Sequence, residues 1–104
     1  MKTISYNIEA VITLLPTELG GLKRAICSGY RPDIGFNVEK QYSCEVELLG
    51  SEELKPGETA RVLIALLPAR TISENMKCSY VFSIREGRKI IGLGAIRAVN
   101  VALV

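Results

Sequence analysis

The most informative part of the chain is Phe82–Ile96, which reads FSIREGRKIIGLGAI. Phe82 and Ile84 alternate with polar neighbours, which is the two-residue period of a half-buried β-strand. Charged residues then interrupt the pattern, and Gly87 among them can open a two-residue loop at positive φ, as a type II′ hairpin turn requires. The chain is apolar again from Ile90 onward. This part of the sequence therefore predicts a β-hairpin with a charged tip.

The second strand of the predicted hairpin contains two glycines, Gly92 and Gly94. They share one face of the strand, and the other face carries Ile91, Leu93 and Ala95. Glycines two residues apart in a strand usually mark the close approach of another backbone or a bend in a barrel. We therefore expect Gly92 and Gly94 to face a crowded neighbour.

Short segments with the same alternation make up most of the remaining chain. In Ser43–Leu48 we expect the apolar residues to face inward and Glu45 and Glu47 to face water. Thr59–Leu67 is apolar on both faces, so this strand should be central or covered on its outer side. Besides the hairpin, the expected extended segments are Ile8–Leu14, Asp33–Val38, Ser43–Leu48 and Thr59–Leu67, and Leu22–Ile26 is expected to return toward the sheet.

Turn residues separate these segments, and no long amphipathic helix is predicted. Gly29–Pro32 reads as a turn or bulge, since a proline disfavours helical dihedrals at the residue before it. Lys55–Glu58 contains Pro-Gly, a strong turn signal. Short strands with frequent turns predict an all-β fold, either a barrel or a sandwich. With 104 residues, we expect a single domain, 1–104.

Composition excludes several classes of protein. The chain is 48% hydrophobic and 23% charged, which is ordinary for a globular domain. A formal net charge of +2 is too small to indicate nucleic-acid binding by itself. The first residues lack the apolar core of a signal peptide, and no apolar run approaches the ~20 residues needed to cross a bilayer. We expect a cytoplasmic protein with no membrane partner.

The residues that usually carry catalysis are scarce. The chain has no histidine, so the usual general base near neutral pH is missing. Its cysteines, Cys27, Cys44 and Cys78, are odd in number and widely spaced, which fits neither a zinc site nor a complete set of disulfides. We interpret them as reduced, small, buried hydrophobic residues. No phosphate-binding loop motif is present. We therefore predict no enzymatic activity, no cofactor, no metal and no nucleotide.

Three short motifs occur in a recognisable order along the chain: Gly20-Gly21 with Gly29–Pro32, then Leu54–Glu58, then Arg85–Gly94. In these motifs the sequence resembles the third, C-terminal domain of elongation factor Tu, and the resemblance covers roughly Ile8 to Val99. The resemblance implies a closed six-stranded antiparallel β-barrel. The nucleotide-binding domain of that factor has no counterpart in this sequence.

The resemblance also implies a candidate RNA-contacting edge. In that family, the loop after the double glycine and the Arg-Glu-Gly hairpin both lie against the backbone of the T stem of transfer RNA. Leu22 and Arg88 depart from the family pattern, in which arginine and a second glycine occupy these positions. A single domain would make only about three to five phosphate contacts, so binding should be weak and salt-sensitive. The alternative is that these are ordinary solvated charges. The candidate RNA-contacting residues are Lys23, Arg24, Glu86, Gly87, Arg88 and Lys89.

The second candidate function is protein binding. A strand that is apolar on both faces needs cover, and an exposed apolar surface usually marks an interface. The alternative is that the apolar C-terminal tail itself covers the barrel. We favour a protein partner or a homo-oligomer over transfer RNA, because the net charge is low and the RNA-contacting loop departs from the family pattern. The candidate interface residues are Val11, Leu63, Leu67, Leu93, Val99 and Val101.

Overall fold

The structure is a computed structural model, and it describes residues 8–36, 41–67 and 80–99. The single helical element in these ranges is a short 3₁₀ helix, η1, at Thr17–Leu19. The strands are β1 Ile8–Leu14, β2 Ile26–Cys27, β3 Asp33–Gly35, β4 Gln41–Leu48, β5 Glu53–Leu54, β6 Thr59–Leu67, β7 Val81–Glu86 and β8 Lys89–Val99.

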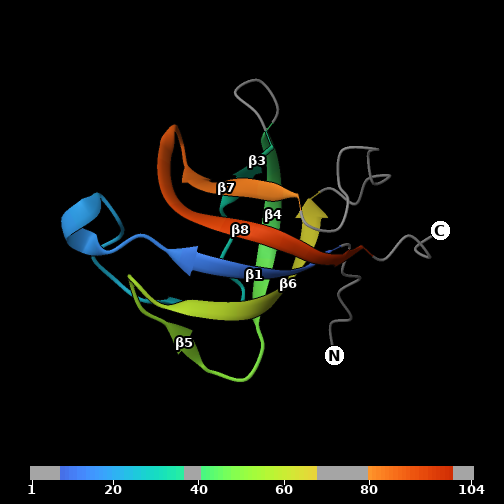
Figure 1. The fold of residues 1–104 in the computed structure, drawn as a ribbon, viewed down its shortest axis with the longest axis horizontal. Helices are drawn as coiled ribbons and strands as arrows, with labels where there is room; N and C mark the ends of the chain where they lie inside the picture. The colour runs from blue at the N-terminus through green and yellow to red at the C-terminus, as the bar shows by residue number, and fades with distance from the viewer. Residues whose placement is uncertain (1–7, 37–40, 68–79, 100–104) are drawn as a thin grey trace.

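Six of the strands form a closed barrel in the order β1-β6-β4-β3-β7-β8 (Figure 1). All of the pairings are antiparallel, and β8 returns to pair with β1 along almost its whole length. In a closed barrel every strand has two neighbours, so no long strand edge is exposed. The prediction of a small, closed, antiparallel all-β barrel is confirmed. β2 and β5 form a separate two-stranded sheet that the sequence did not predict.

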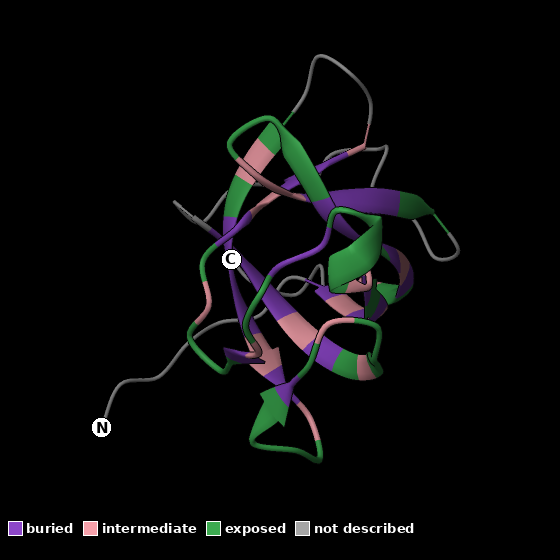
Figure 2. Ribbon diagram, turned by 90° about the vertical axis from the view of Figure 1, so that its left-hand side faces the viewer, coloured by how far each residue is buried: buried purple, intermediate pink, exposed green. Residues whose placement is uncertain are grey.

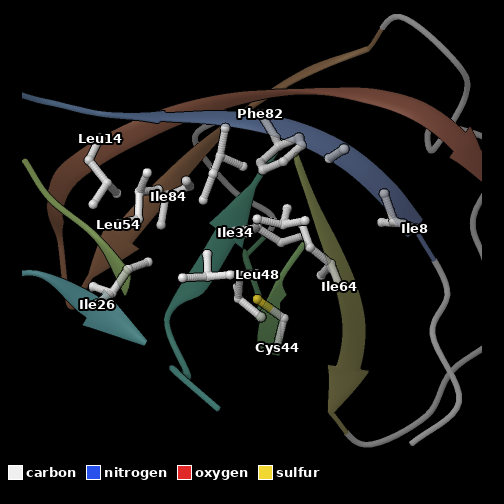
Figure 3. Close-up of a cluster of buried hydrophobic side chains, with 14 of the residues drawn as sticks. Ile8, Leu14, Ile26, Ile34, Cys44, Leu48, Leu54, Ile64, Phe82 and Ile84 are labelled. Carbon is white, nitrogen blue, oxygen red and sulfur yellow. The ribbon is translucent and has the colours of Figure 1, made fainter. Parts of the chain in front are cut away.

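Alternate residues of the barrel strands fill its interior. In β1, for example, Ile8, Ala10, Ile12 and Leu14 are all at most 1% exposed. Figure 3 shows side chains from opposite walls meeting in one cluster. Ile26 and Leu54 of the small sheet join it beside Leu14 and Ile84, so this sheet helps to close one end of the barrel. The remaining buried members of the cluster are Leu22, Ile34, Cys44, Val46, Leu48, Val62, Ile64, Leu66, Phe82, Ile91 and Ile96.

A β-bulge in β8 overturns one detail of the predicted alternation. Ile84 pairs with Gly92 whereas Arg85 pairs with Ile90, which leaves Ile91 as an extra residue in β8. Ile91 is therefore completely buried, and the expectation that it shares a face of the strand with Leu93 is wrong. The bulge is a property of the pairing with β7, so the β8 sequence alone could not reveal it.

Contrary to the prediction, Glu45 does not face water. Glu45 is only 9% exposed, because the guanidinium of Arg31 lies against its carboxylate. Nη2 of Arg31 is 2.8 Å from Oε1 of Glu45. Nε of the same arginine also donates a hydrogen bond to this oxygen. The outward direction of Glu45 was predicted correctly, but a cation from another part of the chain covers it. Glu47, two residues on, is half-buried.

Of the two cysteines that the structure describes, one agrees with the interpretation of them as buried residues and one does not. Cys44 is completely buried in the core. Cys27 is a free, exposed cysteine on β2, so its predicted burial is wrong. It lies in the short β2–β5 sheet, of which only alternate residues reach the core. Cys78 and Val38 lie outside the described residues, and β3 ends at Gly35.

The close approach predicted at Gly94 is confirmed, and it yields a stability prediction. A Cβ at this position would lie 2.4 Å from Cζ of Phe82, whose ring is 2% exposed and held in the core. Gly94→Ala should therefore destabilise the protein by about 1–3 kcal/mol, the usual cost of overpacking, as measured by denaturant unfolding. In a Phe82→Leu background the same substitution should cost clearly less. An equal cost in both backgrounds would show that the ring is not what excludes the methyl group.

A second prediction concerns the turn of the β7–β8 hairpin. Gly87 has a φ of 65° and is the first residue of the two-residue loop, as the sequence predicted. Gly87→Val should cost about 1–3 kcal/mol of unfolding free energy, because a β-branched residue is strained at positive φ. Gly87→Asn is the matched control and should cost less, since asparagine adopts positive φ more readily than a β-branched residue does. Coincident denaturation midpoints for wild type and Gly87→Val would contradict this account of the turn.

Candidate functional site

The two segments of the predicted basic edge meet at one end of the barrel. Nη2 of Arg24 lies 2.9 Å from Oε2 of Glu86, although the two residues are 62 positions apart in the sequence. The hydroxyl of Tyr30 donates a 2.5 Å hydrogen bond to the same carboxylate oxygen. Glu86 thus ties the loop before β2 and the turn at Tyr30 to the β7–β8 hairpin.

The cations at this end form a surface that we call the basic end, defined as Lys23, Arg24, Arg88 and Lys89. All four are exposed, and so is Gly87 in the turn between them. Figure 2 faces the side of the molecule from which η1 projects in Figure 1, and exposed segments in green are prominent on it. The contact of Arg24 with Glu86 brings together the two segments that carry the six predicted RNA-contacting residues.

Hydrogen bonds hold the loop that carries Lys23 and Arg24 in a compact shape. The amide of Gly21 donates to the carbonyl of Pro16 at 3.0 Å, and the amide of Leu15 donates to the carbonyl of Ile91 at 2.9 Å. Leu22 is 6% exposed and belongs to the core cluster, so it anchors the loop. The leucine at the position where the resembling family has arginine is therefore a core residue here.

The carboxylate of Glu86 is stabilised in its charged form. The hydrogen bond from Tyr30 is the main cause that lowers the pKa of Glu86, and Arg24 and Lys89 lower it further. Burial and the neighbouring carboxylate raise the pKa of Tyr30 well above its ordinary value. At neutral pH the cluster therefore consists of an anionic Glu86, a neutral phenol and a paired guanidinium.

A second surface lies on the outside of the barrel. The large hydrophobic side chains that are exposed in the described residues are Leu19, Tyr80, Val81, Ile90 and Leu93. All except Leu19 belong to the β7–β8 hairpin or directly precede it. This concentration of apolar exposure on one hairpin is unlike the scattered single residues that most surfaces show.

The strand register extends this surface on to β1. Val81 pairs with Ala95, Ala95 pairs with Val11, and residues directly opposite each other point to the same face. Val11 and Ala95 are half-buried, whereas Val81 and Leu93 are 64% and 48% exposed. We define the apolar stripe as Val11, Val81, Ile90, Leu93 and Ala95.

Two of the predicted interface residues, Val11 and Leu93, lie in the apolar stripe. Leu63 is half-buried on β6 opposite Glu9, whose Oε2 lies 3.1 Å from Nη2 of Arg61. Val99 packs against the core. The side chain of Leu67 and the whole of Val101 lie outside the part of the chain that the structure describes.

Sequence reasoning missed Val81, Ile90 and Ala95 as members of this surface. The outer positions that follow Val81 in β7 are Ser83 and Arg85, so the outer face of this strand reads as polar. The apolar surface is assembled across three strands, and the only available signal was the high apolar content of β8.

The core of the barrel contains a buried thiol, that of Cys44. Burial, with a smaller contribution from Asp33, raises the pKa of the Cys44 thiol to about 12, so it stays protonated at neutral pH. No group of three or more acidic, cysteine or histidine side chains in the described ranges could hold a metal ion. None of the helices in those ranges has the length and apolar character needed to cross a bilayer. Compared with known protein families, the sequence matches no family model.

The Glu86 cluster yields a prediction that depends on pH. Tyr30→Phe should raise the pKa of Glu86 toward the ordinary value of 4.5 and lower the unfolding free energy at neutral pH by about 0.5–1.5 kcal/mol. This cost is smaller than is usual for a hydrogen bond to a charged group, because the Glu86 side chain is 35% exposed and solvent weakens the interaction. A depressed carboxyl pKa stabilises the fold above the unfolded-state pKa, and this stabilisation is lost as the pH falls through the folded-state value. The difference in unfolding free energy between Tyr30→Phe and wild type should therefore become smaller at acidic pH.

Carbon-detected NMR titration of the glutamate carboxyls, together with denaturant unfolding at several pH values, would check this. Tyr42→Phe is the matched control, because Tyr42 packs edge-on against Phe36 and not against Glu86. The account of the cluster is wrong if Glu86 titrates identically in Tyr30→Phe and in wild type.

Proposed function

We propose that the protein is a non-enzymatic, cytoplasmic binding module whose main binding surface is the apolar stripe on β7, β8 and β1. The observation that carries the proposal is the concentration of exposed large hydrophobic residues on this one hairpin. In this proposal the occupant of the stripe is a protein, either another chain or a second copy of this one.

The stripe is not needed to complete the barrel core. The inward face of the same strands already supplies Phe82, Ile84 and Ile96 to the interior, each at most 2% exposed. Val81 and Leu93 remain in water, where burial against a partner would gain roughly 25 cal/mol for each Å² of apolar surface removed.

The surroundings of the stripe resemble the rim of a binding site. Thr13 and Thr59 lie beside it and share a hydrogen bond between their hydroxyls at 2.7 Å. The Arg61–Glu9 ion pair lies on the adjoining strands. An apolar centre with a polar margin is the usual anatomy of a protein–protein interface.

Two features support a binding role over an enzymatic one. The chain contains no histidine, and the buried thiol of Cys44 stays protonated at neutral pH. The resemblance to the third domain of elongation factor Tu points the same way, because it is to a barrel domain and not to the nucleotide-binding domain of that factor. We propose that the chain is a relative of that barrel.

A photo-crosslinking amino acid placed at position 93 tests this proposal. In cells, a crosslinker in place of Leu93 should give discrete protein adducts, and mass spectrometry of the adducts would show whether the partner is this chain or another protein. The matched control is the same crosslinker in place of Glu52, an exposed residue outside the stripe. Equal labelling from both positions, or no adduct from position 93, would contradict a protein-binding stripe.

A second candidate function is weak binding of transfer RNA by the basic end. The observation in its favour is the Arg24–Glu86 contact, which brings two distant basic segments to one surface. We rank it below protein binding because Leu22 is a core residue and the exposed cations are few. A gel shift with transfer RNA at low and at physiological salt would test it, since phosphate contacts weaken steeply with salt.

A further inference from the structure

We infer that the protein partner of the apolar stripe carries a segment in which apolar residues are followed by acidic residues, and that the acidic residues bind the basic end. This inference rests on the proposed function, because it names the chemistry of the partner at the same surface. Its basis is that the apolar stripe and the basic end are continuous along β8.

The continuity is visible in the order of residues at the start of β8. Lys89 of the basic end is followed directly by Ile90 of the apolar stripe, and Leu93 and Ala95 continue the stripe along the same strand. Successive residues of a strand point to opposite faces, so Lys89 lies on the Glu86 side of the hairpin while Ile90 points outward. A ligand that leaves the stripe at Ile90 therefore reaches the basic end as it crosses the rim of the barrel.

The length of this path suits a short extended segment. Lys89 and Ala95 are six residues apart, which corresponds to roughly 20 Å at the rise of a β-strand. An extended peptide of about seven residues covers the same distance. One segment can therefore place apolar side chains on the stripe and carboxylates at the basic end simultaneously.

Charge at the basic end favours an anionic ligand. Its four cations are exposed, and the carboxylate that contacts one of them directly is that of Glu86. Glu86 already accepts hydrogen bonds from Arg24 and Tyr30. The exposed ammonium of Lys23 and the exposed side chains of Arg88 and Lys89 are left to attract further negative charge.

The apolar stripe favours a protein segment over a nucleic acid as the source of that charge. A phosphate backbone would meet the basic end but would leave Val81, Leu93 and Ala95 uncovered. A peptide with an apolar part and an acidic part matches both surfaces. Its apolar contacts would supply most of the affinity, and its charges would speed association and set the orientation.

Selection from a phage library that displays random peptides tests the inference without knowledge of the natural partner. Peptides selected on the wild-type protein should combine apolar residues with a cluster of aspartate and glutamate. The binding of a selected peptide, measured by fluorescence polarisation, should weaken about tenfold in Arg88→Glu and in Lys89→Glu and should fall as salt is raised. Leu93→Asp should weaken it as well.

Lys55→Glu is the matched control, because it makes the same change of charge on the exposed β5–β6 turn, at a residue that belongs neither to the basic end nor to the apolar stripe. It should leave peptide binding unchanged. Circular dichroism and denaturant unfolding of each variant would separate a loss of binding from a loss of fold.

The possible outcomes separate this inference from the proposed function. The inference of an acidic segment is wrong if no peptides are selected or if the selected peptides lack acidic residues. It is also wrong if the selected peptides bind Lys89→Glu as well as they bind wild type. The stripe itself still stands in that case if the crosslinker at position 93 captures a protein. The inference is overturned if no peptide is selected while transfer RNA binds the wild-type protein and loses affinity in Arg88→Glu and Lys89→Glu. The basic end would then be an RNA-binding surface.

Discussion

The barrel depends on the close packing of the Phe82 ring against the backbone of Gly94. A Cβ at Gly94 would lie within 2.7 Å of two ring atoms, so only glycine lets β8 pass over the ring. β8 has to occupy this position because it pairs with β7 on one side and with β1 on the other. That double pairing closes the sheet. Closure in turn leaves one interior for all the inward-facing side chains, and it leaves no open edge among the six barrel strands.

Closure also places the two candidate surfaces next to each other. With Phe82 and Ile84 directed inward, Val81 and Leu93 must point outward, and the pairing with β1 adds Val11 to the same face. At the hairpin tip, Glu86 reaches the loop before β2 because the β2–β5 sheet packs across that end of the barrel. The apolar stripe and the basic end are thus two consequences of one hairpin, which is why a single bound segment can use both.

The candidate site was predictable only in part. Resemblance to a known barrel assigned Lys23, Arg24 and the hairpin tip to one surface, and the Arg24–Glu86 contact brings them together in the structure. The apolar stripe was harder to predict, since Val81 and Ala95 are neighbours only through the pairing of β7 with β8. Leu93 and Val11 were identified as apolar residues expected on the outer side of the barrel. The hydrogen bond between Tyr30 and Glu86 cannot be predicted from the local sequence around either residue.

By itself, the sequence determined the properties that depend on a few consecutive residues. These include the alternation that makes the barrel strands amphipathic, the positive φ at Gly87 and the tight turn at Lys55–Glu58, in which Gly57 has a φ of 89°. Only the tertiary structure decided the strand order, the bulge that buries Ile91 and the cover that Arg31 provides for Glu45. The physical reason is that dihedral preferences and residue periodicity are local, whereas register, bulges and ion pairs depend on residues brought together from distant parts of the chain.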